Sequence, residues 1–422
     1  MYASRQSNST SDDQNIIQEE AAQWEMYIGI CKSVPAIISN IFFGSWSDRV
    51  GRKKILILPV IGDFLNAVCY WLCAFYFSAP IFYLFIGNAI SALFGNHAAV
   101  LMSVYAYVSD LTTEATRTKR VILLESMTYL GSVISNLTGG LMLERYGFVP
   151  VYSLIVFLYA LLAIYLIFLK ESLPLVNNEA KKVANLLSKQ RLFEALSVVT
   201  KRRTGRYRMS LFLLLGCFFF LVLLFNGINS ITVFFVLHSP LSFTSSQIGY
   251  LFTEINGVRF VGATIINLLF FIKLQVRDCY IIMLAALTYS GFTFMLGMST
   301  TPLLVFLAPL WSLGEGGGVA STRAGLSKMV GKSEQGKLFS IVACLEVCVA
   351  LVSSTIFNTI YRYTVRISPS FTFFVMSGMA IVPLALALIS RSMSPREQYN
   401  SDDTERSNPE NQGRSSSYDA LE

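Results

Sequence analysis

Ionisable side chains inside long apolar stretches are the residues of this sequence best suited to chemistry. Glu125, Glu315, Arg323 and His97 each fall within such a stretch. A charge inside a lipid bilayer is costly, so these residues are candidates for binding an ion or a solute. A carboxyl group can carry a proton, an arginine can hold a carboxylate through two hydrogen bonds, and a histidine can change charge near neutral pH. Together they suit the movement of protons and anions.

The stretches that hold these residues have the length and composition of membrane-spanning helices. Apolar residues make up 54% of the chain and charged residues 14%, against roughly 25% charged in soluble domains. Runs of about 20 apolar residues are long enough to cross a bilayer as helix. The sequence therefore predicts an all-α membrane protein with eleven spans, each read as one helix: 26–46, 55–77, 81–108, 121–143, 149–169, 210–236, 247–272, 279–299, 302–326, 338–361 and 369–391.

Lysine and arginine positions predict how these spans are oriented. Most of them fall in alternate loops, and only Arg5, Arg145, Arg362 and Arg366 fall in the loops between. Because cytosolic loops are rich in these residues, we expect the N-terminus outside or in the lumen and the C-terminus in the cytosol. The predicted parts are an outer segment (1–25), a first half of five spans (26–170), a basic cytosolic loop (171–209), a second half of six spans (210–391) and a disordered cytosolic tail (392–422).

The composition also excludes several classes of function. The net charge of +7 follows from this loop bias, so we expect membrane lipid and not nucleic acid as the partner of the basic residues. The sequence contains no zinc-binding spacing, no phosphate-binding P-loop and no nucleophile elbow. With two histidines in the whole chain, we expect neither an enzyme nor a metal or cofactor site.

A motif directly after the first span points to a family. It reads Gly44-Ser45-Trp46-Ser47-Asp48-Arg49-Val50-Gly51-Arg52-Lys53-Lys54, and it resembles the G-x-x-x-D-[RK]-x-G-R-[RK] signature of the major facilitator superfamily. A cluster that merely stops translocation would not need Gly44 and Asp48 at this spacing. Small residues such as Gly44 let helices approach closely, and a carboxylate such as Asp48 is favoured at a helix N-terminus.

The resemblance implies a fold and a role for the motif. It implies a bundle of two six-helix halves, in which a network holds the outward-facing state: Gly44, Asp48, Arg49, Gly51, Arg52 and Lys53. In that superfamily the signature lies between the second and third helices. Here one span precedes it, so we expect that the chain begins one helix late, which agrees with the division into five and six spans.

Finer resemblance covers the chain from Trp24 to about Arg391. The matching stretches are Arg117-Thr118 through Leu123-Leu124-Glu125, His238-Ser239-Pro240 with Ile248-Gly249-Tyr250, Arg323-Ala324-Gly325-Leu326-Ser327-Lys328, and Ser333-Glu334-Gln335-Gly336-Lys337-Leu338-Phe339-Ser340. They are similar to solute carrier family 46, which includes proton-coupled folate carriers. The resemblance implies that Glu125 couples proton movement and that Arg323 binds substrate and proton. It also matches Asp110 to an aspartate at the inner end of the fourth helix of the family.

Each of these assignments has an alternative. Glu125 is otherwise a structural hydrogen-bonded carboxyl, Arg323 a cation reaching the helix end, Asp110 part of a cytosolic loop and His97 a packing residue. Glu315 lies in the run Gly314-Glu315-Gly316-Gly317-Gly318. This run is a candidate for an unwound helix beside a cavity, with Glu315 as a substrate contact.

The expected function is proton-coupled transport of small organic anions, either folate- or pterin-like or muropeptide-like. The folate carriers have a functional histidine in the seventh helix, where this chain reads Phe225-Asn226-Gly227-Ile228-Asn229. A non-transporting truncated isoform with a regulatory or partner role is the alternative. Asn8 begins a glycosylation sequon that is usable if it faces the lumen, and Tyr418 to Leu421 form a possible sorting motif. We expect residence in the plasma membrane or a lysosomal or endosomal membrane.

Overall fold

The chain folds into a bundle of long helices. A computed structural model describes residues 11–76, 80, 82–112, 114–172, 207–238, 240–266, 277–330 and 335–393. The first half contains α2 (Ser11–Val50), α3 (Arg52–Phe75), α4 (Phe82–Leu93), α5 (Asn96–Asp110), α6 (Glu114–Tyr146) and α7 (Phe148–Phe168). The second half contains α9 (Tyr207–Leu237), α10 (Ser245–Val261), the π-helix η2 (Gly262–Ile266), α11 (Asp278–Met298), α12 (Pro302–Leu307), the 3₁₀-helix η4 (Ala308–Gly314), α13 (Glu315–Lys328), α14 (Gln335–Thr364), α15 (Phe371–Met379) and α16 (Ile381–Met393).

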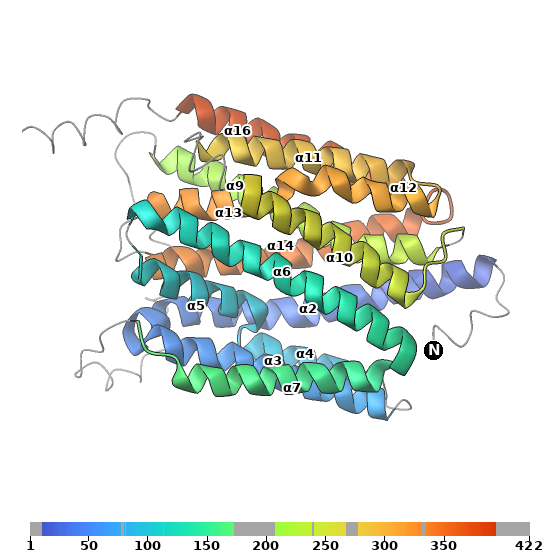
Figure 1. The fold of residues 1–422 in the computed structure, drawn as a ribbon, viewed down its shortest axis with the longest axis horizontal. Helices are drawn as coiled ribbons and strands as arrows, with labels where there is room; N and C mark the ends of the chain where they lie inside the picture. Colours follow the sequence, from blue (N-terminus) through green and yellow to red (C-terminus); the bar gives the residue numbers. More distant parts are fainter. Residues whose placement is uncertain are drawn as a thin grey trace, which may run out of the picture.

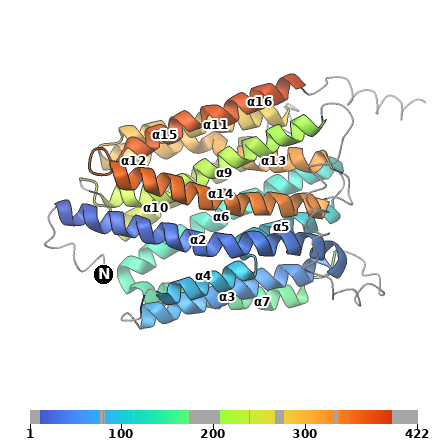
Figure 2. The same cartoon turned by 180° about the vertical axis from the view of Figure 1, so that it is seen from behind.

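The helices run side by side along one common direction (Figure 1). Most helices of the first half, drawn in blue to green, lie below those of the second half, drawn in light green through yellow to red. Two pairs of long helices join the halves. Helix α2 packs along α14, and α6 packs along α10. Figure 2 shows the first pair lying against each other over much of their lengths.

The prediction of an all-helical membrane bundle is confirmed. Within the described residues, ten segments are helical, long and apolar enough to cross a membrane. They are Glu20–Gly44, Arg52–Phe75, Phe82–Asp110, Arg120–Tyr146, Phe148–Phe168, Arg208–Leu237, Asp278–Met298, Pro302–Lys328, Lys337–Thr364 and Phe371–Arg391. The remaining predicted span, 247–272, corresponds to α10 and η2, whose described part runs over residues 245–266.

Two predicted details are wrong, and the helix that contains the first predicted span is longer than that span. It begins by Ser11, because the polar residues before Met26 include good helix formers such as Glu, Gln and Ala. The span over 81–108 is two helices, since Gly95 and Asn96 take positive φ angles of 89° and 49°. Such a conformation favours glycine and asparagine and ends a helix. The glycine run after Glu315 is helical, and the distortion lies before it, in η4.

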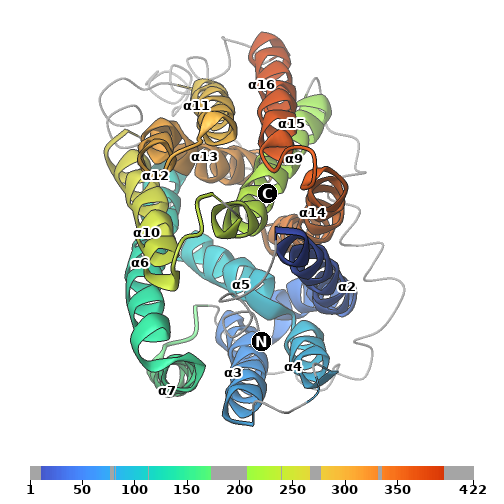
Figure 3. The same cartoon turned by 90° about the vertical axis from the view of Figure 1, so that its right-hand side faces the viewer.

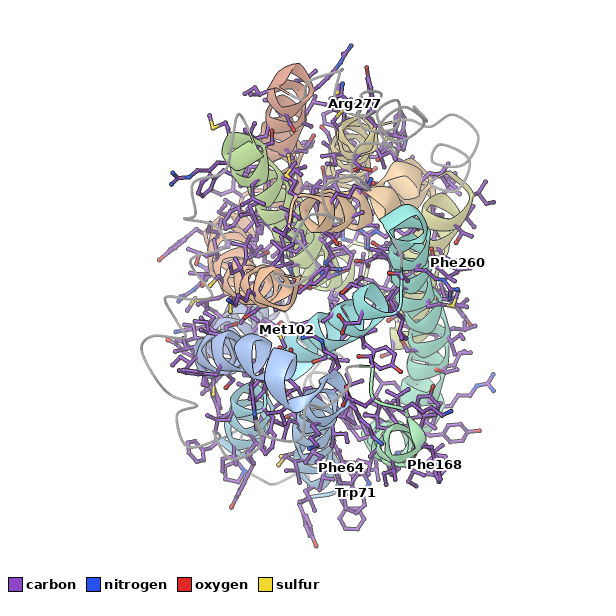
Figure 4. The ribbon with its side chains drawn as sticks, turned by 90° about the vertical axis from the view of Figure 1, so that its left-hand side faces the viewer. Phe64, Trp71, Met102, Phe168, Phe260 and Arg277 are labelled. Carbon is purple, nitrogen blue, oxygen red and sulfur yellow. The ribbon has the colours of Figure 1, made fainter. Side chains whose placement is uncertain are left out.

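Apolar side chains cover the outside of the bundle as well as its interior. Phe168, at the end of α7, is 79% exposed, whereas Met102 of α5 is 3% exposed. Figure 4 shows Phe168 at the edge of the bundle and Met102 at its centre. A soluble protein rarely leaves so much apolar surface uncovered, so this outer face is the surface in contact with lipid.

Several predicted features lie outside the described residues. These are the sequon at Asn8, the basic loop apart from its first and last residues, and the tail that contains Tyr418 and Leu421.

Candidate functional site

A cavity of about 500 Å³ lies between the two halves of the bundle. Its walls come from α2, α3, α4, α5 and α6 of the first half and α9, α13 and α14 of the second. Several of these helices surround the middle of the bundle in the end-on view of Figure 3. The ionisable lining residues other than tyrosine are Glu25, Lys32, His97, Glu125, Arg323 and Glu346. A cavity of this size between two membrane halves suits a small organic solute.

Arg323 of α13 is the centre of the most densely connected cluster in the wall. Its guanidinium forms an ion pair with Glu125 of α6, and a second ion pair of 2.8 Å with Glu346 of α14. The Nη1 group also donates to the Tyr105 hydroxyl at 3.1 Å. Arg323 is 3% exposed and Glu125 is 6% exposed. A single buried cation therefore holds two carboxylates from two other helices.

Aromatic rings complete the surroundings of this guanidinium. Its central carbon lies 4.8 Å from the ring centre of Tyr105 and 5.3 Å from that of Phe218. A cation over the face of an aromatic ring is attracted by the electrons of that ring. Tyr105 and Phe218 come from α5 and α9, so side chains of four other helices fix the position of Arg323.

The sequence explains how these side chains reach one site. Glu125 lies about one turn after Arg120, where the apolar part of α6 begins, and Glu346 lies near the middle of α14. Arg323 follows the glycine run 316–318 on α13. Small residues let neighbouring helices approach closely. Gly318 fits against Ala285 of α11, and a side chain on Gly318 would collide with it.

A second polar wall of the cavity belongs to the first half. It contains Glu25 and Lys32 of α2, Asn88 of α4 and His97 of α5. Asn88 donates from Nδ2 to the Tyr70 hydroxyl at 2.9 Å. Because α5 begins at Asn96 after the break at Gly95, His97 lies in the first turn of a new helix. The break therefore places polar groups in the middle of a span.

Glu315 lies in a different buried cluster, behind the wall of the cavity. Its Oε2 atom accepts from Arg259 Nε at 2.8 Å and lies 2.7 Å from Arg259 Nη2. Arg259 is fully buried, and its guanidinium lies 4.9 Å from the ring centre of Phe225. Phe225 lines the cavity, whereas Glu315 and Arg259 do not. The structure thus pairs the predicted substrate contact Glu315 with an arginine outside the cavity.

Asp110 also lies outside the cavity lining, at the end of the bundle where α2 meets α3. Its Oδ2 atom is 2.9 Å from Arg52 Nε, and Arg52 Nη1 donates to Ser47 Oγ at 2.6 Å. Glu171 accepts from the backbone N–H groups of Arg52 and Lys53, at 2.7 Å and 3.2 Å. A carboxylate at the first turn of a helix is stabilised by the helix dipole. The predicted latch motif therefore binds both α5 and the chain after α7.

The glycines of the motif have separate structural roles. Gly51, with a φ of 108°, is the one residue between α2 and α3, and this conformation favours glycine. Gly44 packs so closely on Ser340 of α14 that a Cβ atom on Gly44 would overlap the Ser340 side chain. Asp48 and Arg49 belong to α2, but their side chains are outside the described part of the chain.

The structure thus brings Glu125, Arg323 and His97 to one cavity and places Glu315 and Asp110 elsewhere. Neither Glu346 nor Tyr105 was selected as a site residue from the sequence. Glu346 was detectable as a carboxylate inside an apolar span. Tyr105 carries no such signal, because tyrosines are common in these helices. Within the described residues, no group of three or more His, Cys, Asp or Glu side chains is placed to hold a metal ion.

Comparison with known proteins defines the class to which this fold and cavity belong. The sequence pattern of the Major Facilitator Superfamily matches residues 17–272, which is more than half of the chain. The lysosomal proton-coupled steroid conjugate and bile acid symporter of Gallus gallus is 30% identical over 377 residues, covering 88% of this chain and 80% of that protein. The chain belongs to the Major Facilitator Superfamily and is a transporter, in agreement with the prediction that it is not an enzyme.

Within the superfamily the chain is related to solute carrier family 46, as predicted. The proton-coupled folate transporter of Rattus norvegicus is 26% identical over 399 residues, covering 91% of this chain and 82% of that protein. The Homo sapiens steroid conjugate and bile acid symporter is 28% identical over 377 residues, with coverage of 88% and 80%.

Solved structures of the superfamily share the fold. The human organic anion transporter MFSD10 gives a TM-score of 0.67 at 18% identity, covering 88% of this chain and 89% of that one. The fucose:proton symporter of E. coli gives a TM-score of 0.61 at 14% identity, with coverage of 90% and 94%. At these identities the likeness supports the architecture alone.

Proposed function

We propose that this transporter couples the entry of a proton to the movement of an organic anion through the central cavity. The observation that supports this most directly is the arrangement at Arg323. One guanidinium, 3% exposed, holds the carboxylates of Glu125 and Glu346 at the wall of the cavity. A substrate carboxylate or sulfate has the same chemistry as these two side chains, so it competes with them for Arg323.

Protonation of Glu125 is the step that frees part of Arg323 to bind the substrate anion. A neutral carboxyl group binds an arginine much less strongly than a carboxylate does, because charged hydrogen bonds are the stronger ones. When Glu125 takes up a proton, Arg323 keeps Glu346 and gains room for one further anion. When the substrate leaves on the other side, Glu125 returns its proton and pairs again with Arg323. The proton and the anion therefore cross together.

The charge balance of the cavity favours the same coupling. Its lining contains three carboxylates, Glu25, Glu125 and Glu346, against the two cations Lys32 and Arg323. With all of these groups charged and His97 neutral, the cavity has one negative charge in excess. An anion entering this low-dielectric site would add to that excess at a high electrostatic cost. A proton taken up with the anion removes that cost.

The remaining lining indicates the kind of anion. Apolar side chains cover much of the cavity between the charged groups, among them Ile28, Leu101, Val222, Phe225 and Val347. Such a surface suits an anion with a large apolar body. Relatives of this chain are named as symporters of steroid conjugates and bile acids or as a folate transporter. We propose amphipathic organic anions of the bile acid and steroid conjugate kind as substrates, ahead of folates and muropeptides.

The site residues then take the following roles. Glu125 carries the proton and Arg323 holds the anion, while Arg52 and Asp110 with Gly44 and Gly51 form the latch at one end of the bundle. We propose that this end faces the cytosol, in a plasma, lysosomal or endosomal membrane, with the N-terminus on the opposite side. His97, which lines the same cavity, is the second titratable group of the proton path.

Uptake by the chain in a host without related carriers tests this function. The chain is routed to the cell surface, and entry of labelled taurocholate, folate and a muramyl peptide is measured at acidic and at neutral outer pH. We expect taurocholate uptake that rises as the outer solution becomes acidic. The matched control is Asp278→Asn, which removes a carboxylate that does not line the cavity. Absence of uptake of every anion, with the protein at the surface, favours a non-transporting regulatory role instead.

A further inference from the structure

Lys32 is a cation in the lining of the central cavity. It lies in the middle of the apolar part of α2, halfway along the segment Glu20–Gly44, and its side chain is exposed into the cavity. Within the described residues, no carboxylate lies within ion-pair distance of its ammonium group. Arg323, the other cation in the lining, has two such partners. Of the two cations in the lining, Lys32 is therefore the one whose charge is not already held by an ion pair within the described residues.

Two carboxyl groups lie near Lys32 without forming an ion pair with it. Glu25 lies seven residues earlier on α2, and Asp63 of α3 lies near enough to Lys32 to attract it electrostatically. Asp63 is itself held by Ser91, whose hydroxyl donates to Asp63 Oδ1 at 2.5 Å. His97 is a further neighbour of Asp63 and lines the cavity. A lysine side chain is long and flexible, so its ammonium can turn from these acids to a ligand.

The two cations stand on different halves of the bundle. Lys32 belongs to α2 of the first half, and Arg323 belongs to α13 of the second. Apolar lining residues of α2 and α9, such as Ile28 and Val222, contribute to the surface of the same cavity. A ligand with two anionic groups on an apolar body matches this arrangement of two cations and apolar lining.

We propose that Lys32 is a second anion-binding point of the cavity and selects organic anions with two acidic groups, one held by Lys32 and the other by Arg323. This inference rests on the proposed function, in which Arg323 becomes free when Glu125 takes up a proton. Lys32 needs no such release. Lys32 therefore binds the first acidic group before the second binds to Arg323.

A matched pair of probes separates the two binding points. Taurolithocholate carries one sulfonate, and taurolithocholate 3-sulfate carries a second anionic group at the far end of the same steroid body. Uptake of both is measured in the full chain, in Lys32→Gln and in Lys32→Arg. Glu25→Gln is the matched control, because it changes the opposite charge on the same helix and in the same cavity. Binding of both probes to the purified proteins is measured alongside.

We expect the full chain to prefer the dianion, with the lower KM. The preference is the KM of the monoanion divided by the KM of the dianion. Lys32→Gln should reduce this ratio about tenfold, the effect of one lost ion pair of moderate strength. Lys32→Arg should restore the preference, and Glu25→Gln should keep or increase it. A ratio of KM values, unlike a rate, is independent of how much protein folds and reaches the membrane.

Three results would overturn the inference. They are equal KM values for the two probes in the full chain, an unchanged ratio in Lys32→Gln, and an equal loss of preference in Glu25→Gln. If the purified protein binds the dianion in a Lys32-dependent way but no form transports it, this inference holds and the proposed transport function fails. If neither probe binds, both fail.

Discussion

The guanidinium of Arg323 on α13 and the carboxylate of Glu125 on α6 form a buried ion pair between the two halves of the bundle. They are separated by 198 positions in the chain. Because this contact lies at the cavity wall, we expect anything that breaks it to change both the binding of an anion and the contact between the halves. In the proposed function, the pair therefore connects substrate binding to the rearrangement that transport requires.

Replacement of Glu125 by glutamine should remove the response of uptake to pH. In the full chain we expect uptake to rise as the outer pH falls, because in the proposed function protonation of Glu125 releases Arg323. Glutamine is neutral at every pH and leaves Arg323 permanently available. We expect net acid-driven uptake to fall about tenfold or more, while exchange of labelled for unlabelled anion continues. Exchange is measured in vesicles preloaded with unlabelled substrate. Uptake by Glu125→Gln that still rises on acidification would contradict the assignment.

Replacement of Arg323 should separate the roles of charge and geometry. Lysine keeps the charge but lacks the planar group that holds Glu125, Glu346 and Tyr105 together. We expect Arg323→Lys to fold and to raise the KM for the anion about tenfold or more. Arg323→Met leaves two carboxylates without their cation and should cost about 3–5 kcal/mol of stability, read as a lower Tm.

A double variant checks the origin of that loss. Arg323→Met combined with Glu125→Gln removes one of the stranded charges, so its Tm should recover part of the difference. An unchanged or lower Tm in the double variant would mean that Arg323 stabilises the fold through something other than its carboxylate partners.

The close contact of α2 with α14 should be sensitive to a single methyl group. A Cβ atom at Gly44 would overlap Ser340, whose hydroxyl donates to the Asn40 carbonyl at 3.0 Å. We expect Gly44→Ala to push these helices apart and to lower stability by about 1–3 kcal/mol. Ser340→Gly should restore much of the Tm in the double variant, because it removes the atoms that the new methyl group meets. Failure of this rescue, with the same loss of Tm in both variants, would contradict the contact.

Much of this architecture was predictable from the sequence. Runs of apolar residues indicated the positions of the helices, and the motif from Gly44 to Lys54 indicated the superfamily. The break at Gly95 was not predictable in the same way. Glycine is tolerated inside membrane helices, so its presence does not reveal whether the backbone turns there. The left-handed conformation of Asn96 is visible only in the folded structure.

The candidate site was likewise predictable from the sequence only in part. Glu125 and Arg323 were identifiable because ionisable groups are rare inside spans. Their pairing was not, since sequence spacing says nothing about which distant helices meet. For the same reason Glu315 was expected at the cavity, whereas the structure pairs it with Arg259, 56 positions away. Tyr105 contributes an ordinary hydroxyl and ring, so only the folded structure identifies it as a neighbour of Arg323.

The Arg259–Glu315 pair should behave as a structural unit. Both side chains are buried, so Arg259→Met alone leaves the Glu315 carboxylate without its cation and should destabilise the protein by about 3–5 kcal/mol. The double variant Arg259→Met with Glu315→Met should be close to the full chain in Tm, because both charges are gone. Thermal unfolding of the purified proteins measures this. A double variant as unstable as the single one, or one whose uptake loses its pH response, would contradict a purely structural pair.

Proton movement driven by substrate is the most direct test of the central claim that Glu125 couples a proton to the anion held by Arg323. Purified protein is placed in vesicles with a pH-sensitive dye outside, and taurocholate is added without a pre-existing pH difference. The account predicts that the outer solution becomes more alkaline as the anion enters, and that Glu125→Gln abolishes this change while still binding taurocholate. Anion entry without any change in outer pH, or an unchanged proton signal in Glu125→Gln, would contradict it.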